Sequence, residues 1–421
     1  MDNSNNFAIN QSINISSEDL ATTSKDAQKS TTKPSKSWLV FLISGIVAFL
    51  GGIGCAIYTF LMPEEVKENL IFPTIPSQVN TSKTYSNLTG LELADANLKN
   101  SPAYCVQTPN DTYGARPQTG LNNAGVVFEA IAEGGITRFA AIYQNPTVDI
   151  FGPVRSIRLY YLDWDTPFDC TVVHAGGSIE ALDAISSRGT KHLTENYSYM
   201  YRGNYNYHSY DNIFLTPNSL ASFSSDYGYT TSEISGFTRL NPNDSIKNRY
   251  DNLAISPLEI TTPSVKDTSE LDPVVSEIHF DFGGSDEFNI DYTYNLDTNS
   301  YDRSYTYGGK HEVYSCTNGE DLFDQDPVDV CPLVQLSPNV VIAMMVDERR
   351  HRDGVHEAIT TVGEGTAYVF QNGDAIKGTW KKSSLEDQIR FYDEDGTEIS
   401  LAPGQTWISA LPTTYGGYVD Y

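Results

Sequence analysis

The segment at residues 38–62, WLVFLISGIVAFLGGIGCAIYTFLM, most restricts what this chain can fold into, because it contains no charged side chain. It is longer than the roughly 20 apolar residues that a helix needs to cross a bilayer. Four lysines precede it, and the first charges after it are Glu64 and Glu65. Since positive residues flank the cytoplasmic end of a spanning helix, we expect a single-pass membrane protein with a cytosolic N-terminus and an extracytoplasmic remainder.

Two other interpretations of this segment stay open. A cleaved signal peptide is one, although its apolar stretch would be shorter. Lipidation at Cys55 is the other, because Cys55 follows a Gly-Ile-Gly sequence that loosely resembles a bacterial lipid-attachment site. The residues after Cys55 remain apolar, so a thiol inside a spanning helix is the alternative to lipidation.

The net charge excludes one class of partner. The 421 residues include 54 acidic and 27 basic side chains, which gives a formal charge of −27. Nucleic acid is therefore not expected as a partner, because phosphate backbones are bound by Lys and Arg. The acidity is typical of a solvated exterior.

Changes of composition along the chain predict its organisation. The expected parts are a disordered cytosolic tail at 1–36, a transmembrane helix at 37–62, a linker at 63–87, a first domain at 88–235, a connecting segment at 236–272, a second domain at 273–412 and a tail at 413–421. The first domain mixes types, since CTVVHAGGSIEALDAISSRG indicates a strand, a glycine loop and a helix that ends near Gly189. Hairpins dominate the second, for example TAYVFQNGDAIKGTW with its Asn-Gly turn. The expected fold class is α+β: a membrane-anchored ectodomain with a mixed α/β first domain and a mostly β second domain.

The cysteines beyond the apolar segment agree with an oxidising compartment, because they form an even set. Cys316 and Cys331 bracket a short acidic loop and are the pair that we predict to be bonded. Cys105 and Cys170 lie in strand-like runs, and they are either a second bonded pair or two buried thiols.

Arg138 lies in a predicted hairpin that turns at Gly134 and Gly135. A two-residue loop pairs Glu133 with Ile136, which would place Glu129, Glu133 and Arg138 on one face. The hairpin therefore predicts a structural ion network that braces Arg138. The alternative is a cleft that uses the same Glu–Arg cluster.

Arg155 and Arg158, in the segment GPVRSIR, have no carboxylate close by in the sequence. Their spacing lets them share one face of a helix, and Ser156 or a neighbour can cap that helix. Positive side chains at a helix start oppose the helix dipole unless an anion binds there. These two arginines therefore indicate an anion site.

A glycine loop of Gly176, Gly177 and Ser178 reinforces this prediction, because its backbone N–H groups can cradle an anion beside His174. Ser178 is otherwise an ordinary helix N-cap, and His174 a hydrogen-bonded strand histidine. A Ser178 nucleophile with His174 as its base is disfavoured, because the Gly-x-Ser-x-Gly elbow is missing.

Two further polar segments are candidate sites. YRGNYNYHSYDNIF places His208 and Asn212 in an aromatic loop. DERRHRDGVHE at 347–357 is rich in possible ligands, but its spacing matches neither a zinc helix nor a calcium loop. No metal and no cofactor are therefore expected.

The stretches LTGLELADANLKN, ARPQTGLNNAGVVFEAIAEGGITRFAAIY, GPVRSIR and VVHAGGS together resemble the YerB-like lipoproteins of bacteria, a family of unknown function (DUF3048). YDRSYTYGGKH, NVVIAMM, GTAYVFQNGDAIKGTW and PGQTWISALP are similar to that family's C-terminal domain. The resemblance implies a two-domain, membrane-attached protein on the outer face of the cytoplasmic membrane. It implies no activity.

The resemblance also marks residues as candidate ligand-binding positions. They are Arg116, Glu129, Glu133, Arg138, Arg155, Arg158, His174, Gly176, Gly177 and Ser178, with weaker matches at His208, Asn212 and His311. The sequence departs from the family at the lipid-attachment motif, which is poor here. It also departs at Glu312, where the family has an aspartate one place further on, and in the loop between Cys316 and Cys331, which looks like an insertion.

The leading hypothesis is a non-catalytic envelope protein. Its first domain would bind an anionic cell-wall polymer or a partner protein through Arg155, Arg158, His174 and the glycine loop. One alternative is an enzyme, a hydrolase or transferase acting on cell-wall polymers, with Glu129 or Glu133 and His174 as its acid–base pair. The other is a structural assembly factor whose charges brace the fold.

Overall fold

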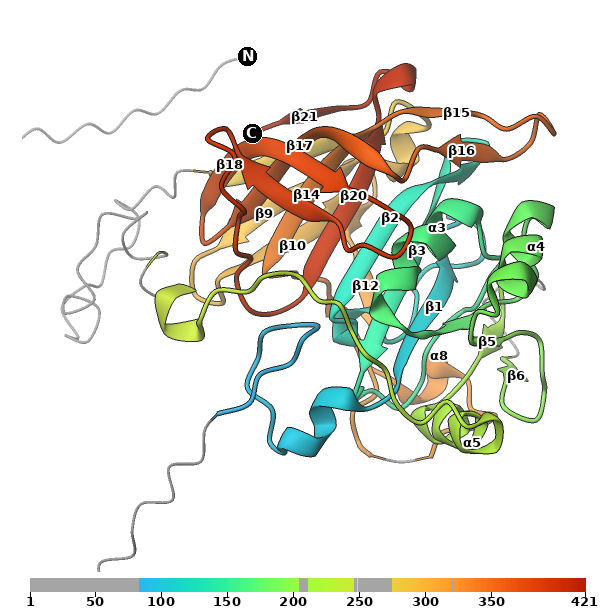
Figure 1. Cartoon of the computed structure of the whole chain (residues 1–421). Helices are drawn as coiled ribbons and strands as arrows, with labels where there is room; N and C mark the ends of the chain where they lie inside the picture. The colour runs from blue at the N-terminus through green and yellow to red at the C-terminus, as the bar shows by residue number, and fades with distance from the viewer. Residues whose placement is uncertain (1–82, 204–210, 246–247, 249–274, 320) are drawn as a thin grey trace, which may run out of the picture. The chain divides into compact units, whose positions relative to one another are not determined.

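A ten-stranded sheet is the centre of the fold (Figure 1). The computed structural model describes residues 83–203, 211–245, 248, 275–319 and 321–421. The strands of the sheet lie in the order β19 (Arg390–Asp393), β18 (Asp374–Lys382), β17 (Gly363–Gln371), β14 (Val340–Val346), β20 (Thr406–Pro412), β2 (Val126–Glu133), β3 (Ile136–Gln144), β1 (Ala103–Pro109), β4 (Thr171–Val173) and β5 (His192–Leu193).

Strand β20 joins the two sequence regions. It pairs in parallel with β14 on one side and with β2 on the other, where Val126 lies opposite Thr406 and Glu129 opposite Ser409. The two regions predicted on either side of the connecting segment therefore contribute strands to one sheet. The fold is strand-rich with few helices in the part that the structure describes, which confirms a mixed class of α and β structure.

A second sheet packs on one face of the first. Its strands are β11 (Gly309–Lys310), β10 (Ser300–Tyr305), β9 (Ile290–Asn295), β8 (Glu277–Asp281) and β21 (Tyr418–Asp420). The shared core contains Phe280 and Tyr292 from this sheet and Val341 and Phe370 from the large one. Residues 413–421, expected as a loose tail, instead include β21, which pairs with β8.

Two helices, α3 (Leu159–Asp165) and α4 (Ile179–Arg188), cover the opposite face of the large sheet (Figure 1). Tyr161 and Trp164 of α3 and Ile185 of α4 share one core with the strand residues Phe128 and Ile342. Burying apolar surface of this kind contributes about 25 cal/mol per Å². The helix α5 (Pro217–Tyr227) packs Leu220 and Phe223 into a separate core beside β1.

The helix and loop after β4 fold as predicted. Ser178 is the N-cap of α4, where its hydroxyl accepts a hydrogen bond from Ala181 N, and Gly189 ends the helix with a φ of +64°. The predicted helix at GPVRSIR begins later than expected, because its N-cap is Arg158 rather than Ser156. Arg155 therefore lies before the helix, and the expectation that both arginines share a helical face was wrong.

The reason is a backbone pairing that the sequence does not reveal. Ala175 N donates to Arg155 O at 3.0 Å, and Ile157 N donates to Gly176 O at 3.1 Å. The residues before α3 are thus held extended against the glycine loop.

The hairpin of β2 and β3 turns at Gly134 and Gly135, and Glu133 pairs with Ile136, as predicted. A register shift between Ile131 and Glu133 then moves every earlier pair by one residue, which places Glu129 opposite Phe139 and Arg138 opposite Ala130. Side chains alternate between faces, so Glu129 and Arg138 lie on opposite faces of the sheet. Their predicted common face was wrong.

Both pairs of outer cysteines are bonded. The predicted disulfide between Cys316 and Cys331 is confirmed. Cys105 and Cys170 form a second disulfide, which decides the alternative that the sequence left open.

In the described part of the chain, no helix has both the length and the apolar character needed to cross a bilayer. The segment predicted to span the membrane, with Cys55, and the tail at 1–36 lie outside the described residues, as does the linker up to residue 82.

Candidate functional site

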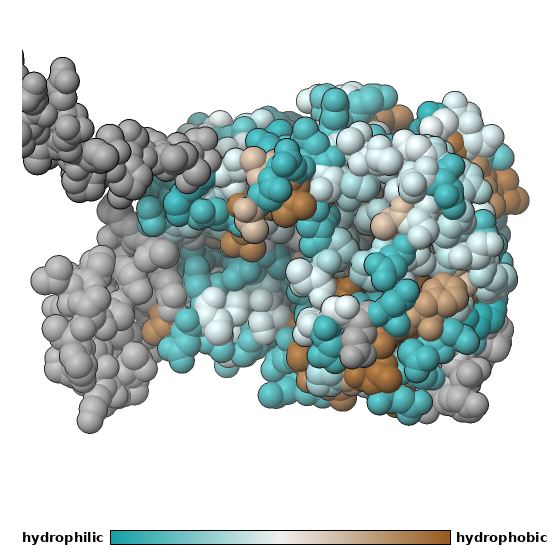
Figure 2. Space-filling model, turned by 90° about the horizontal axis from the view of Figure 1, so that it is seen from below, coloured by the Kyte–Doolittle hydropathy of each residue, from teal (hydrophilic) through white to brown (hydrophobic). Residues whose placement is uncertain are grey.

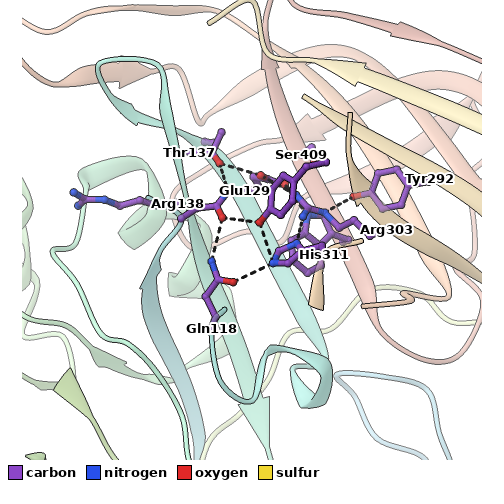
Figure 3. Close-up of polar contacts among 12 residues, drawn as sticks. Gln118, Glu129, Thr137, Arg138, Tyr292, Arg303, His311 and Ser409 are labelled. Carbon is purple, nitrogen blue, oxygen red and sulfur yellow. Dashed lines mark hydrogen bonds and ion pairs between the residues drawn. The ribbon is translucent and has the colours of Figure 1, made fainter. Parts of the chain in front are cut away.

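Glu129 lies at the centre of a buried polar junction between the two sheets (Figure 3). The side chains of Glu129 and Arg303 are both 0% exposed, and Arg303 Nη2 donates to both carboxylate oxygens, at 3.0 and 2.8 Å. Trp407 Nε1 donates to Glu129 Oε2 at 2.9 Å, and Thr137 Oγ1 donates to Glu129 Oε1 at 3.0 Å. The carboxylate is therefore surrounded by donors from β3, β10 and β20.

His311 extends this junction (Figure 3). Its Nδ1 accepts a hydrogen bond from Arg303, and its Nε2 donates to Gln118 Oε1 at 3.0 Å. Tyr305 OH donates to Asn110 Oδ1 at 2.8 Å, and Asn110 Nδ2 donates to Thr137 Oγ1 at 2.7 Å. Because Thr137 also donates to Glu129, these contacts connect the far end of the network to the Glu129 carboxylate.

Arg116, a predicted site residue, borders the same junction. Its guanidinium lies 3.7 Å from the centre of the Tyr305 ring, and its Nε donates to Asn110 Oδ1 at 2.9 Å. Burial and the charges of Arg303 and Arg116 hold the pKa of His311 well below its ordinary value, so the imidazole is neutral. Burial opposes the charge of Arg303, but Glu129, Tyr292 and Tyr305 together outweigh burial and raise the pKa of Arg303. The junction is one charged pair set in neutral hydrogen-bonding groups, with the Arg116 guanidinium at its border.

Glu133 forms a second network on the opposite face, with two of the predicted arginines. Its Oε1 is paired with Arg138, and its Oε2 accepts from Arg158 Nη2 at 2.6 Å. Burial raises the pKa of Glu133, but the charges of Arg138 and Arg158 outweigh it and place the pKa below its ordinary value. Glu133 thus pairs its one negative charge with two buried guanidinium groups.

Arg155 belongs to a third network. Its Nε lies 2.7 Å from Oδ1 of Asp211, a buried residue. The neighbouring Asn212 accepts from Arg202 Nη1 at 2.6 Å and donates to Gly203 O at 3.2 Å. Asn212 is thus held at the hairpin of β6 (Tyr201–Arg202) and β7 (Ile213–Phe214). His208, the other predicted residue of this loop, lies outside the described residues.

His174 is fully buried and hydrogen-bonded on both ring nitrogens. Nδ1 donates to Gly176 O at 2.8 Å, and Nε2 accepts from His192 Nδ1 at 3.1 Å. Burial lowers the pKa of His174 to about 4, so the ring is neutral at neutral pH. In the glycine loop, Ser178 N donates to Ile157 O at 3.1 Å, and a Cβ on Gly177 would lie 2.6 Å from Ile157 Cγ2. The glycines permit close approach to the backbone, and the group that approaches it is Ile157 of the same chain.

The structure therefore brings the predicted residues together in separate groups rather than in one pocket. Arg138 and Arg158 both pair with Glu133, and Arg155 pairs with Asp211. The hydrogen-bond partners of His174 in the described part of the chain are a backbone carbonyl and another imidazole, and neither is a carboxylate.

The sequence did not reveal a pocket with a volume of about 710 Å³. We call it the basic pocket, because its lining includes Lys83, Lys99, Arg239 and Arg390. None of its described lining residues is acidic, although the chain has twice as many acidic as basic side chains, 54 against 27. Its other polar groups include Asn87 and Asn241.

Arg239 is the most unusual member of the basic pocket. Its guanidinium donates to three neutral oxygens, Leu88 O at 2.6 Å, Thr406 Oγ1 at 2.8 Å and Ala402 O at 2.9 Å. Its Nε is buried without a hydrogen-bond partner among the described residues, and none of the described ion pairs includes Arg239. Burial lowers the pKa of Arg239 to about 9, so it stays positive at neutral pH. This charge lacks a counter-ion within the described fold.

Lys83 and Arg390 differ from Arg239, because carboxylates outside the pocket lining partly balance them. Lys83 Nζ lies 2.6 Å from Glu92, and Arg390 Nη1 lies 3.4 Å from Glu398. Lys99 forms none of the ion pairs found among the described residues. The pocket as a whole has excess positive charge.

Two groups that contain acidic residues lie at the hairpin of β15 (Glu348–Arg350) and β16 (Glu357–Ile359), and the second of them includes Glu180 of α4. Glu348 is 0% exposed, and neither of its carboxylate oxygens has a hydrogen-bond partner among the described residues. Burial, with the charge of Glu357, raises the pKa of Glu348 to about 8. It is therefore mostly a neutral acid at neutral pH.

The other group lies at the tip of the hairpin, where Glu180, His351 and Asp353 place possible metal-ligating atoms within 4.8 Å of one another. His351 Nε2 lies 2.7 Å from Glu180, and Asp353 lies 2.6 Å from His356 Nδ1. These residues are partly exposed, and their ligating atoms already contact one another directly.

Comparisons with known proteins agree with this fold. Residues 88–230 match the family model described as "Protein of unknown function (DUF3048) N-terminal domain", and residues 278–408 match its C-terminal domain. The chain is 28% identical over 335 residues to the Bacillus subtilis (strain 168) protein named "Putative lipoprotein YerB". This alignment covers 78% of this chain and 87% of that protein. The crystal structure of the Bacillus subtilis YerB protein aligns with a TM-score of 0.61 and 22% identity, over 80% of this chain and 100% of that one. At this identity the structural likeness concerns the fold.

Proposed function

We propose that this chain, which belongs to the DUF3048 family through its N-terminal and C-terminal domains, is a membrane-attached envelope protein that binds an anionic ligand in the basic pocket. The ligand class is a polymer or headgroup that carries phosphates or carboxylates, as cell-wall polymers do. The protein acts in this proposal as a non-catalytic binding module.

The single observation that carries the proposal is the charge of the pocket lining. Four basic side chains and no acidic ones among the described lining residues surround a space of about 710 Å³. In a chain with a net charge of −27, such a local excess of positive charge favours an anion there and disfavours cations. Arg239 adds a buried guanidinium whose Nε still has a donor to offer.

On the face drawn in Figure 2, most residues are hydrophilic or of intermediate hydropathy, and hydrophobic residues form small separate groups. Broad apolar patches usually mark protein or membrane contacts.

Envelope attachment rests on two supports. The Bacillus subtilis relative is named as a lipoprotein, and the apolar segment at 38–62 here is long enough to cross a bilayer. We propose a single-pass helix with the described residues outside the membrane, because lysines precede the segment and carboxylates follow it.

The pocket is favoured over the site predicted from GPVRSIR, because an anion there would have to displace carboxylates that already pair with the arginines. Asp211 holds Arg155, and Glu133 holds Arg158. The enzyme alternative needs Glu129 or Glu133 beside His174, but the structure keeps the two glutamates in networks on opposite faces of the sheet and pairs His174 with His192. The ion pairs of the arginines favour the bracing role of the assembly-factor alternative for these residues.

A binding titration tests the proposal. The full chain, purified in detergent, is titrated with a linear polyphosphate and with polygalacturonate at low salt. We expect saturable binding that weakens as salt rises, and a loss of at least tenfold in affinity for Lys99→Glu. Lys310→Glu is the matched control, since this exposed lysine of β11 lies in the second sheet and changes the net charge equally.

Two outcomes would overturn it. One is no binding of either polymer. The other is an equal loss in both lysine variants, which would mean that net charge alone governs binding. A loss in Arg155→Ala with Lys99→Glu unaffected would move the site to the predicted loop.

A further inference from the structure

The disulfide between Cys105 and Cys170 lies at the wall of a pocket of about 330 Å³, and the acidic residue Asp165 lines the same pocket. Cys170 and Asp165 both line this pocket. Its other charged lining residues are Arg188, which pairs with Asp163, Lys191, which pairs with Asp169, and the acidic Asp169 and Glu386. Cys170 Sγ lies 3.7 Å from the backbone carbonyl oxygen of Asp165. A reactant that enters the pocket therefore meets a disulfide sulfur and a carboxyl group together.

Asp165 is an unusual side chain for this position. It is 1% exposed, and its Oδ1 has no hydrogen-bond partner among the described residues. Its Oδ2 accepts a hydrogen bond of 2.9 Å from Gln107 Nε2, and the described ion pairs do not include it. A buried carboxylate without a countercharge is costly, so this group holds a proton. Burial accordingly raises its pKa well above the ordinary value.

The strand β1 brings Asp165 and the disulfide together. Cys105 and Gln107 are two residues apart on β1, so their side chains point to the same face, about 7 Å apart along the strand. Gln107 holds the Asp165 carboxyl on that face, and Cys105 is bonded there to Cys170. The Asp165 carboxyl and the sulfur that would leave if Cys170 were attacked therefore lie on the same face of β1.

We propose that Cys105–Cys170 is a reactive disulfide that exchanges with an external dithiol, with Asp165 as the proton donor to Cys105. This inference is independent of the basic pocket. The thiolate of the dithiol attacks Cys170 Sγ and forms a mixed disulfide, while the bond to Cys105 breaks and its electron pair stays on Cys105 Sγ. The Asp165 proton passes to that sulfur and leaves a carboxylate hydrogen-bonded to Gln107.

The second thiol of the dithiol completes the exchange. It attacks the first sulfur of the dithiol, which is bonded to Cys170 in the mixed disulfide. The dithiol closes into a disulfide, and Cys170 is released as a thiolate. This thiolate takes up the proton that the attacking thiol loses. The chain's disulfide is reduced to two thiols and the dithiol is oxidised.

The second disulfide of the same chain is an internal control. Cys331 is 9% exposed and Cys170 is 5% exposed, so accessibility alone predicts that Cys316–Cys331 is reduced first. The native full chain is treated with dithiothreitol between pH 6 and 9, and each cysteine is quantified by differential alkylation and mass spectrometry. We expect Cys105–Cys170 to be reduced at least tenfold faster than Cys316–Cys331.

Variants separate proton donation from structure. Asp165→Asn should slow reduction of Cys105–Cys170 at least fivefold and change the pH profile of its rate, while the rate for Cys316–Cys331 stays constant. Asp163→Asn is the matched control, because Asp163 is buried in the same helix but bonds Arg188 and Thr361 instead. If Asp165→Asn fails to fold, the wild-type comparison of the two disulfides still decides. Reduction of Cys105–Cys170 no faster than that of Cys316–Cys331, or only after unfolding, overturns the proposal.

Discussion

Replacing Glu129 by glutamine removes the negative charge that neutralises Arg303 inside the junction of the two sheets. The substitution changes the shape of the side chain little. It leaves the Arg303 guanidinium, which is 0% exposed, without a countercharge. It also turns one acceptor oxygen into an NH₂ group that faces donors such as Trp407 Nε1 or Thr137 Oγ1.

The structure gives the size of the effect. Removing one partner of a fully buried ion pair costs about 3–5 kcal/mol, because the remaining charge stays buried and unpaired. Against a total stability of about 5–15 kcal/mol for a typical protein, this is a large share. Glu364→Gln is the matched control. The Glu364–Lys381 pair has side chains that are 66% and 50% exposed, and breaking such a surface pair costs about 0–1 kcal/mol.

Urea unfolding of the full chain, followed by tryptophan fluorescence, measures both variants. Trp407 lies in the junction and reports on it directly. A second variant sharpens the test, since adding Arg303→Met to Glu129→Gln removes the unpaired charge and should restore part of the lost stability. A cost for Glu129→Gln as small as that of Glu364→Gln would refute the reasoning, as would a double variant less stable than the single one.

Three other substitutions follow from the same structure. The pKa of Glu348 is about 8 in the folded state and 4.5 in the unfolded state, so the contribution of Glu348 to stability is present below pH 4.5 and is lost as pH rises to 8. The free energy of unfolding should fall by about 1.4 kcal/mol per pH unit in this range. In urea unfolding at several pH values, Glu348→Gln should remove this pH dependence. Gly177→Ala places a methyl group 2.6 Å from Ile157 Cγ2 and should cost about 1–3 kcal/mol by thermal unfolding, and a neutral result would contradict the tight loop contact. Cys331→Ser opens a disulfide that spans 15 positions and should lower the free energy of unfolding by about 3 kcal/mol, whereas an unchanged urea midpoint would show that the loop is not constrained by it.

The sequence predicted those turns and helix ends that depend on one or two neighbouring residues. Asn372 and Gly373 form the turn between β17 and β18 with φ values of +55° and +74°, as the Asn-Gly pair indicated. Gly189 ends α4 for the same kind of reason. A residue that tolerates positive φ is visible in a sequence, so turns and caps of this type can be predicted.

The register of β2 and β3 could not be predicted in this way. The shift between Ile131 and Glu133 involves no glycine and depends on how the strands meet neighbouring elements. Its effect is large, because a shift of one residue moved Glu129 to the face that holds Arg303 and left Arg138 on the other.

The partners of the arginines were hidden for a different reason. Arg158 pairs with Glu133, Arg155 with Asp211, and these carboxylates come from other elements that only the folded topology brings close. The lining of the basic pocket is dispersed from Lys83 to Arg390 and forms no motif. The one available signal was the scarcity of basic residues, which makes each of them worth tracing to a counter-ion.

A crystal structure of the chain with bound linear polyphosphate tests the central claim most directly, because it locates the anion without reference to any variant. The account predicts phosphate density in the basic pocket, within hydrogen-bond distance of Lys99 Nζ and of the Arg239 guanidinium. Phosphate bound at Arg155 and Arg158 with Asp211 or Glu133 displaced would contradict it, as would an empty basic pocket at a polyphosphate concentration that saturates binding in solution.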